Sequence, residues 1–91
     1  MQIVAKVVHY SGRVQGVGFR ATAAWIARKY RVVGWVRNLP DGRVELLVEG
    51  DSEQVDTFLG AIRSRFSNHI FEERAENQNP SGDYQSFEVA N

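Results

Sequence analysis

The chain has 91 residues, a formal net charge of zero and no cysteine, which favours one small domain without disulfides or thiolate metal sites. The neutral total disfavours a nucleic-acid partner, and the N-terminal segment has no apolar run long enough for a signal peptide or a membrane span. His9 and His69 lack the spacing of a metal pair, so we expect a cytoplasmic monomer that binds no metal, no nucleic acid and no membrane.

The first half of the chain predicts a strand, a helix and a hairpin. A β-branched run indicates a strand over Ile3–Tyr10. A helix is expected over Phe19–Tyr30, with one apolar face formed by Phe19, Ala23, Ile26 and Tyr30. Short strands are expected at Val32–Arg37 and Val44–Glu49, joined by the Pro-Asp-Gly turn at residues 40–42.

The second half predicts a helix and two further strands. Asp51 is expected to cap the helix, with Gln54 completing a capping box. The apolar stripe of this helix consists of Val55, Phe58, Leu59, Ile62 and Phe66. A fourth strand is expected at residues 69–76 and a short closing strand at residues 86–89.

This order of elements predicts an α+β fold of the ferredoxin-like, split βαβ type. The expected arrangement is βαββαβ plus a short C-terminal strand, with two helices on one face of a mostly antiparallel sheet. Residues 1–91 would form a single domain. Because the first two strands run in the same direction, we expect the loop after the first strand and Asn38 to meet at one edge of the sheet.

The loop between the first strand and the first helix has the composition of an anion site. It reads GRVQGVGFR over Gly12–Arg20, and its glycines allow the backbone to bend beside a helix N-terminus whose N–H groups lack acceptors. Arg20 opposes the helix dipole, which makes sense if an anion lies between them. The loop has neither the ending of a nucleotide P-loop nor the spacing of a dinucleotide fingerprint.

Charge is divided along the chain in a way that fits this anion site. Residues 1–44 carry eight Lys or Arg and one acid, whereas residues 45–91 carry three bases and ten acids. A positive field around the loop would concentrate small anions. Arg13 and Arg37 are expected to be solvated or steering charges rather than ligands.

Two segments carry a resemblance to a known family. GRVQGVGFR resembles the phosphate-binding signature of the acylphosphatases, and GWVRN at Gly34–Asn38, followed by Pro-Asp-Gly, resembles their second signature. The resemblance implies hydrolysis of the carboxyl–phosphate bond of a small acyl phosphate by water, without metal or cofactor. Inorganic phosphate would be the product and an inhibitor.

The same resemblance implies roles for individual residues. Arg20 would bind the phosphoryl group and Asn38 would orient the attacking water. The loop backbone would wrap the phosphate through Gln15, Gly16, Val17, Gly18 and Phe19, and the Gln15 side chain could instead brace the loop. No Ser/His/Asp arrangement is evident, and an acyl phosphate needs no strong general acid because its leaving group is a stable carboxylate.

Two other functions stay open at this stage. Acylphosphatase-like domains also occur inside larger maturation enzymes, so the chain could be a non-catalytic module that binds phosphate or another anion. An RNA-binding ferredoxin-like domain is the second alternative, for which His9 and Tyr10 on the first strand are a thin basis.

Overall fold

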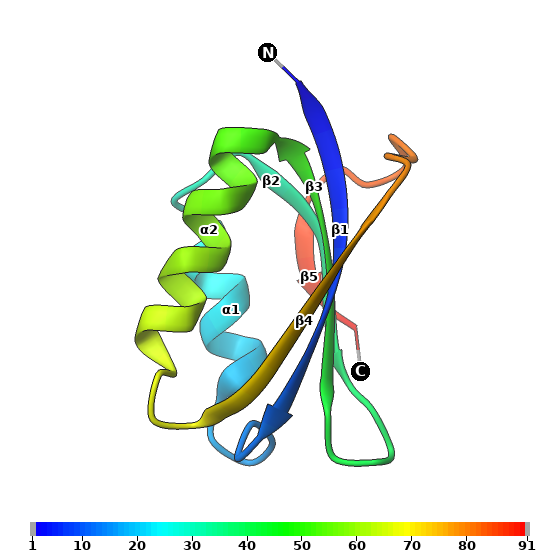
Figure 1. The fold of residues 1–91 in the computed structure, drawn as a ribbon. Coiled ribbons are helices and arrows are strands. Elements are labelled where there is room, and N and C mark those ends of the chain that lie inside the picture. The colour runs from blue at the N-terminus through cyan, green and yellow to red at the C-terminus, as the bar shows by residue number, and fades with distance from the viewer. Residues whose placement is uncertain (1, 91) are drawn as a thin grey trace.

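The computed structural model describes residues 2–90, which contain five strands and two helices. In chain order these are β1 (Ile3–Gly12), α1 (Phe19–Ala27), β2 (Val32–Asn38), β3 (Val44–Asp51), α2 (Ser52–Arg65), β4 (Ile70–Gln78) and β5 (Phe87–Val89). The two helices pack on the same face of a single sheet (Figure 1). Neither helix is long and apolar enough to cross a membrane.

The strands form one sheet in the order β4-β1-β3-β2-β5. The β1–β3, β1–β4 and β2–β3 pairs are antiparallel, and only β2–β5 is parallel. The predicted ferredoxin-like α+β fold is therefore confirmed. Because β3 lies between β1 and β2, the loop after β1 and the end of β2 emerge at the same end of the sheet, which is the lower end in Figure 1.

One core between the helices and the sheet stabilises the fold. Alternate residues of β3 face the helices, and the predicted stripe of α2 is buried against them: Val44, Leu46, Val48, Val55, Phe58, Leu59, Ile62 and Phe66. On α1, the predicted face is buried at Phe19, Ala23 and Ile26, and Tyr30 packs against the core from the following turn. Burial of each large apolar side chain stabilises the folded state by about 1.5–3 kcal/mol.

The ends of the helices differ from the sequence prediction. α1 ends at Ala27, because the N–H groups of Lys29 and Tyr30 donate to carbonyls three residues back, at 3.0 and 3.1 Å, which tightens the chain into a turn. Asp51 is the N-cap of α2, but its side chain makes no capping hydrogen bond. The capping box was wrong: Gln54 Oε1 instead accepts a hydrogen bond from the Arg31 N–H at 3.1 Å.

The first strand is longer than predicted and includes Gly12, the first residue of the glycine loop. Gly12 has φ +124°, and a Cβ there would lie 2.4 Å from the carbonyl oxygen of His69. The neighbouring Arg13 N–H donates to the same carbonyl at 2.9 Å. Glycine at position 12 is thus required by the close approach of the chain at the start of β4, a constraint that the sequence alone did not reveal.

A segment at residues 79–86, which we call the strap, lies against the sheet face opposite the helices (orange in Figure 1). Glu49 is 3% exposed beneath it and accepts hydrogen bonds from Ser81 N–H, Ser81 Oγ–H and Gly82 N–H at 3.0, 3.0 and 3.2 Å. The Trp35 indole N–H also donates to Tyr84 Oη at 3.2 Å. These contacts bring β5 to its place beside β2.

Candidate active site

The loop that leads into α1 depends on two glycines with left-handed backbones. Gly16 and Gly18 both have φ +78°, which L side chains rarely adopt. A Cβ at Gly16 would meet nothing within 4 Å, and one at Gly18 only Thr22 Oγ1 at 3.9 Å. Glycine is therefore required here by conformation rather than by crowding, and Gly18 is the N-cap of α1.

The first turn of α1 presents backbone donors without protein acceptors inside the helix. Its first helical hydrogen bond runs from the Thr22 N–H to the Gly18 carbonyl at 3.0 Å. The N–H groups of residues 19–21 precede that bond, so they have no intrahelical acceptor. Because no acidic residue occupies this turn, an external anion would be stabilised by these donors and by the helix dipole.

An aromatic column fixes the start of α1 on the core. The Phe19 ring lies 4.9 Å from the Tyr10 ring and 4.6 Å from the Phe66 ring, measured between centroids. All three side chains are at most 2% exposed. Packing of this kind restrains the helix N-terminus, so the backbone donors are held in position before any ligand binds.

A depression of about 230 Å³ lies at this helix start. Its lining residues come from the loop, α1, β2 and β5: Val14, Gly16, Gly18, Phe19, Arg20, Ala21, Asn38 and Val89. Asn38 is the last residue of β2, and its side-chain oxygen Oδ1 is buried without a hydrogen-bond partner within residues 2–90. Arg20 and Asn38, which are 18 positions apart in the chain, thus border one small space.

Gln15 ties the loop to the β2–β3 hairpin. Its Nε2 group donates to the carbonyls of Leu39 and Arg43 at 2.9 and 3.0 Å. These bonds brace the loop, which is one of the two roles that the sequence suggested for Gln15. Neither Gln15 nor Val17 is among the residues that line the depression, and Val17 is 38% exposed.

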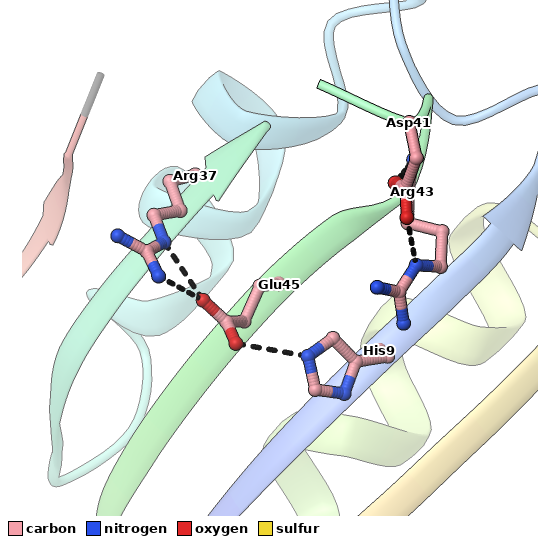
Figure 2. A network of polar contacts seen from close by, with 5 residues as sticks. All are labelled: His9, Arg37, Asp41, Arg43 and Glu45. Carbon is pink, nitrogen blue, oxygen red and sulfur yellow. Dashed lines mark hydrogen bonds and ion pairs between the residues drawn. The ribbon is translucent and has the colours of Figure 1, made fainter. Parts of the chain in front are cut away.

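Arginines near this end of the sheet fall into two groups. Arg37 pairs with Glu45 at 2.6 Å and Arg43 pairs with Asp41 at 2.9 Å (Figure 2). Arg20 is half-buried and makes no side-chain hydrogen bond or ion pair within the part of the chain that the structure describes. Arg20, whose guanidinium borders the depression, is therefore available to an anion.

The paired arginines alter the carboxylates beside them. Burial of Glu45 alone would favour its neutral form, but hydrogen bonds from Arg37 and from His9, whose Nε2 lies 2.8 Å from Oε2, hold the pKa of Glu45 below its ordinary value. The backbone N–H and the side chain of Arg43 lower the pKa of Asp41 in the same direction. Both carboxylates are thus held as structural anions.

Sequence reasoning missed three residues of the depression. Val14 is 1% exposed and belongs to the core as well as to the loop. Ala21 contributes through its place in the first helical turn, a signal that the sequence did contain. Val89 arrives on β5, whose parallel pairing with β2 follows from the strap and could not be read from the residues of β5 alone. Between residues 2 and 90, no group of three His, Cys, Asp or Glu side chains is arranged to hold a metal ion.

Comparison with known sequences gives a consistent picture. A model of the acylphosphatase family matches residues 6–89. An acylphosphatase from Methylococcus capsulatus is 60% identical over 53 residues, an alignment that spans 58% of this chain and 58% of the relative's length. An acylphosphatase from Archaeoglobus fulgidus is 39% identical over 97% of this chain and 99% of its own length.

Solved structures with the same fold include both small and large proteins. The crystal structure of acylphosphatase from Bacillus subtilis superposes with a TM-score of 0.86 at 29% identity, covering 97% of this chain and 99% of that one. HypF from T. kodakarensis superposes with a TM-score of 0.83 at 29% identity, covering 97% of this chain but 12% of HypF. The same domain thus occurs both as most of a small protein and as a small part of a large one.

Proposed function

Because the chain belongs to the acylphosphatase family, we propose that it hydrolyses acyl phosphates to a carboxylate and inorganic phosphate. The observation that carries this proposal is that one depression is lined by two groups without a protein partner within residues 2–90: the half-buried Arg20 guanidinium and the buried Asn38 Oδ1. Buried polar groups are nearly always hydrogen-bonded. A buried, unpaired oxygen in the same depression as an unpaired cation is therefore typical of a site whose ligand supplies the missing partners.

The phosphoryl group of the substrate would bind at the start of α1. The backbone of the loop over residues 15–19 would surround it, the N–H groups of residues 19–21 would donate to its oxygens, and Arg20 would add two parallel donors from its planar guanidinium. These donors stabilise the charge that the phosphoryl oxygens carry in the transition state. Because the donors are fixed beforehand, little reorganisation is needed at the moment of reaction.

Asn38 would hold the attacking water. Its Oδ1 accepts a hydrogen bond from the water, which directs the water oxygen at phosphorus, opposite the acyl oxygen. An uncharged amide suits this role, since a carboxylate would repel the anionic substrate. As the new oxygen–phosphorus bond forms, the bond to the acyl oxygen breaks, and the water's proton passes to a phosphoryl oxygen of the substrate.

The site needs no strong general acid for this substrate. The group that leaves is a carboxylate, whose conjugate acid has a pKa of roughly 4 to 5, so it departs as a stable anion. A phosphate monoester would instead expel an alkoxide or a phenolate, which is less stable. The proposed site therefore predicts selectivity for acyl phosphates over monoesters.

An assay in EDTA tests this proposal. The purified chain should hydrolyse acetyl phosphate with EDTA present and leave 4-nitrophenyl phosphate intact under the same conditions. Complete loss of acetyl phosphate hydrolysis on adding EDTA would contradict the metal-independent mechanism. Comparable hydrolysis of both substrates would contradict the role assigned to the leaving group.

The similarity to a small part of HypF favours a second candidate, a module that binds phosphate without turning over a substrate. The two candidates differ in one result. A module would bind inorganic phosphate at the depression but would not accelerate acetyl phosphate hydrolysis above the buffer rate. We further propose that the chain acts as a monomer in the cytoplasm, which sedimentation at micromolar concentration and cell fractionation would test.

A further inference from the structure

A second, larger hollow lies between α1 and α2 and has no role in the mechanism above. This interhelical groove has a volume of about 620 Å³ and is lined by nine residues of the two helices and the turn after α1. One of its lining side chains is Trp25, which is 57% exposed although tryptophan is usually buried or packed. An exposed indole in a concave surface indicates a contact that the isolated chain leaves unfilled.

The groove carries positive charge without a matching acid. Lys29 lies with its Nζ 4.6 Å from the centroid of the Trp25 ring, and Arg65 lines the opposite wall. Neither cation forms a side-chain ion pair within residues 2–90, and no Asp or Glu lines the groove. An occupant that combines an aromatic body with an anionic group would complement both features.

The groove and the depression share one lining residue. Ala21, in the first turn of α1, lines both. Trp25 lies seven positions beyond the N-cap Gly18, which places it about 10 Å along the helix axis. Because helical side chains lean toward the helix N-terminus, the indole covers surface on the side nearer the proposed phosphoryl site.

We propose that the interhelical groove is an acyl subsite, which takes an extended aromatic acyl group with a second anionic substituent. This inference rests on the proposed function, because it places the phosphoryl end of the same substrate at the start of α1. The aromatic body lies against Trp25, and the distal anion pairs with Lys29 and Arg65. An acetyl group is too short to reach the indole, so the groove discriminates among acyl phosphates by length and charge.

Selectivity measurements test the subsite. The ratio of kcat/KM for 2-naphthoyl phosphate to kcat/KM for acetyl phosphate should fall about threefold to tenfold in Trp25→Ala, the range expected for loss of one aromatic contact. Lys29→Ala should lower the corresponding ratio for 6-carboxy-2-naphthoyl phosphate against 2-naphthoyl phosphate by about threefold. Two matched variants outside the groove, Ile3→Ala for an exposed apolar side chain and Arg28→Ala for an exposed cation, should leave both ratios unchanged.

A binding measurement separates failure of the subsite from failure of the proposed function. 2-Naphthoylphosphonate, which cannot be hydrolysed, should bind more tightly than inorganic phosphate by calorimetry, and Trp25→Ala should remove most of that advantage. This result would support the subsite even if the chain turned over no acyl phosphate. Equal affinity of the phosphonate and of phosphate for the parent, or an unchanged selectivity ratio in Trp25→Ala, would overturn it.

Discussion

The depression at the start of α1 differs from the sheet face opposite the helices in how its polar groups are paired. On that face, Glu49 accepts three hydrogen bonds from the strap, and Glu45 is bonded to both Arg37 and a histidine. In the depression, the Arg20 guanidinium and Asn38 Oδ1 have no partner within residues 2–90. Groups paired within the protein stabilise the fold, whereas the two unpaired groups of the depression are open to a ligand.

Two sets of backbone N–H groups differ in the same way, since only one set has an acceptor among the residues that the structure describes. The N–H groups of Ser81 and Gly82 converge on a carboxylate that the protein itself supplies, Glu49. Those of residues 19–21 begin a helix with no acid in its first turn. The two sets therefore differ in the source of the anion, which the protein supplies at the strap and which the substrate would supply at the proposed site.

The largest effect is expected at Arg20. Arg20→Ala should lower kcat/KM for acetyl phosphate by about 10²- to 10³-fold, because it removes the side-chain cation at the depression. Arg20→Lys should restore little of the rate, since a point charge does not reproduce the planar fork of donors. Steady-state kinetics measure both.

Arg13 provides the matched control for this variant. It is an exposed arginine of the same loop that does not line the depression, so Arg13→Ala should stay within about threefold of the parent if it only steers the substrate. The assignment of Arg20 would be wrong if Arg20→Ala turned over acetyl phosphate as fast as Arg13→Ala.

Asn38 is expected to affect the rate without affecting phosphate affinity. Asn38→Ala should lower kcat by at least about tenfold, because the water loses its orientation. The competitive inhibition constant of inorganic phosphate should stay within about twofold of the parent value. A loss of phosphate affinity as large as that in Arg20→Ala would show that Asn38 holds the phosphoryl group instead.

Glu49, which accepts hydrogen bonds from the strap, should affect stability rather than catalysis. Glu49→Gln turns an NH₂ group toward donors of the strap, so it should lower the free energy of unfolding by about 1.5–3 kcal/mol, the range for hydrogen bonds to a charged group. The urea midpoint measures this change if the m value is unchanged. A midpoint equal to that of the parent would mean that the charge of Glu49 adds nothing to its hydrogen bonds with the strap.

The smallest effect concerns Glu45 and depends on pH. Its folded pKa lies below its ordinary value, so the ionised carboxylate stabilises the fold above about pH 4.5 and that contribution is lost as pH falls through the folded pKa. Parent and Glu45→Gln should therefore differ by about 0.5–1 kcal/mol at about pH 6, and less below about pH 4. Glu76→Gln, at an exposed position of β4, is the control, and a gap that widened in acid would contradict this sign.

Local patterns predicted the fold well where packing and propensity agree. The apolar faces of both helices and the β2–β3 hairpin follow from residue spacing and from one Pro-Asp-Gly turn, and the strand directions then bring Asn38 to the glycine loop. The family resemblance added the division of roles between Arg20 and Asn38, which residue types alone did not supply.

Features that depend on tertiary contacts could not be predicted from the sequence. The capping box failed because Gln54 bonds to Arg31, a partner 23 positions away. Gly12 was assigned to the loop because nothing in its neighbours reveals the approach of His69. Val89 reaches the depression only because the strap carries β5 back to β2.

Amide chemical shifts during titration with inorganic phosphate test the central claim most directly. In ¹H–¹⁵N spectra of the parent, the amides of Gly16, Gly18 and residues 19–21 should shift in a saturable way. Those of Ser81 and Gly82 should not, because both N–H groups already donate to the Glu49 carboxylate. Shifts confined to the strap, or no saturable shift at the start of α1, would contradict the account.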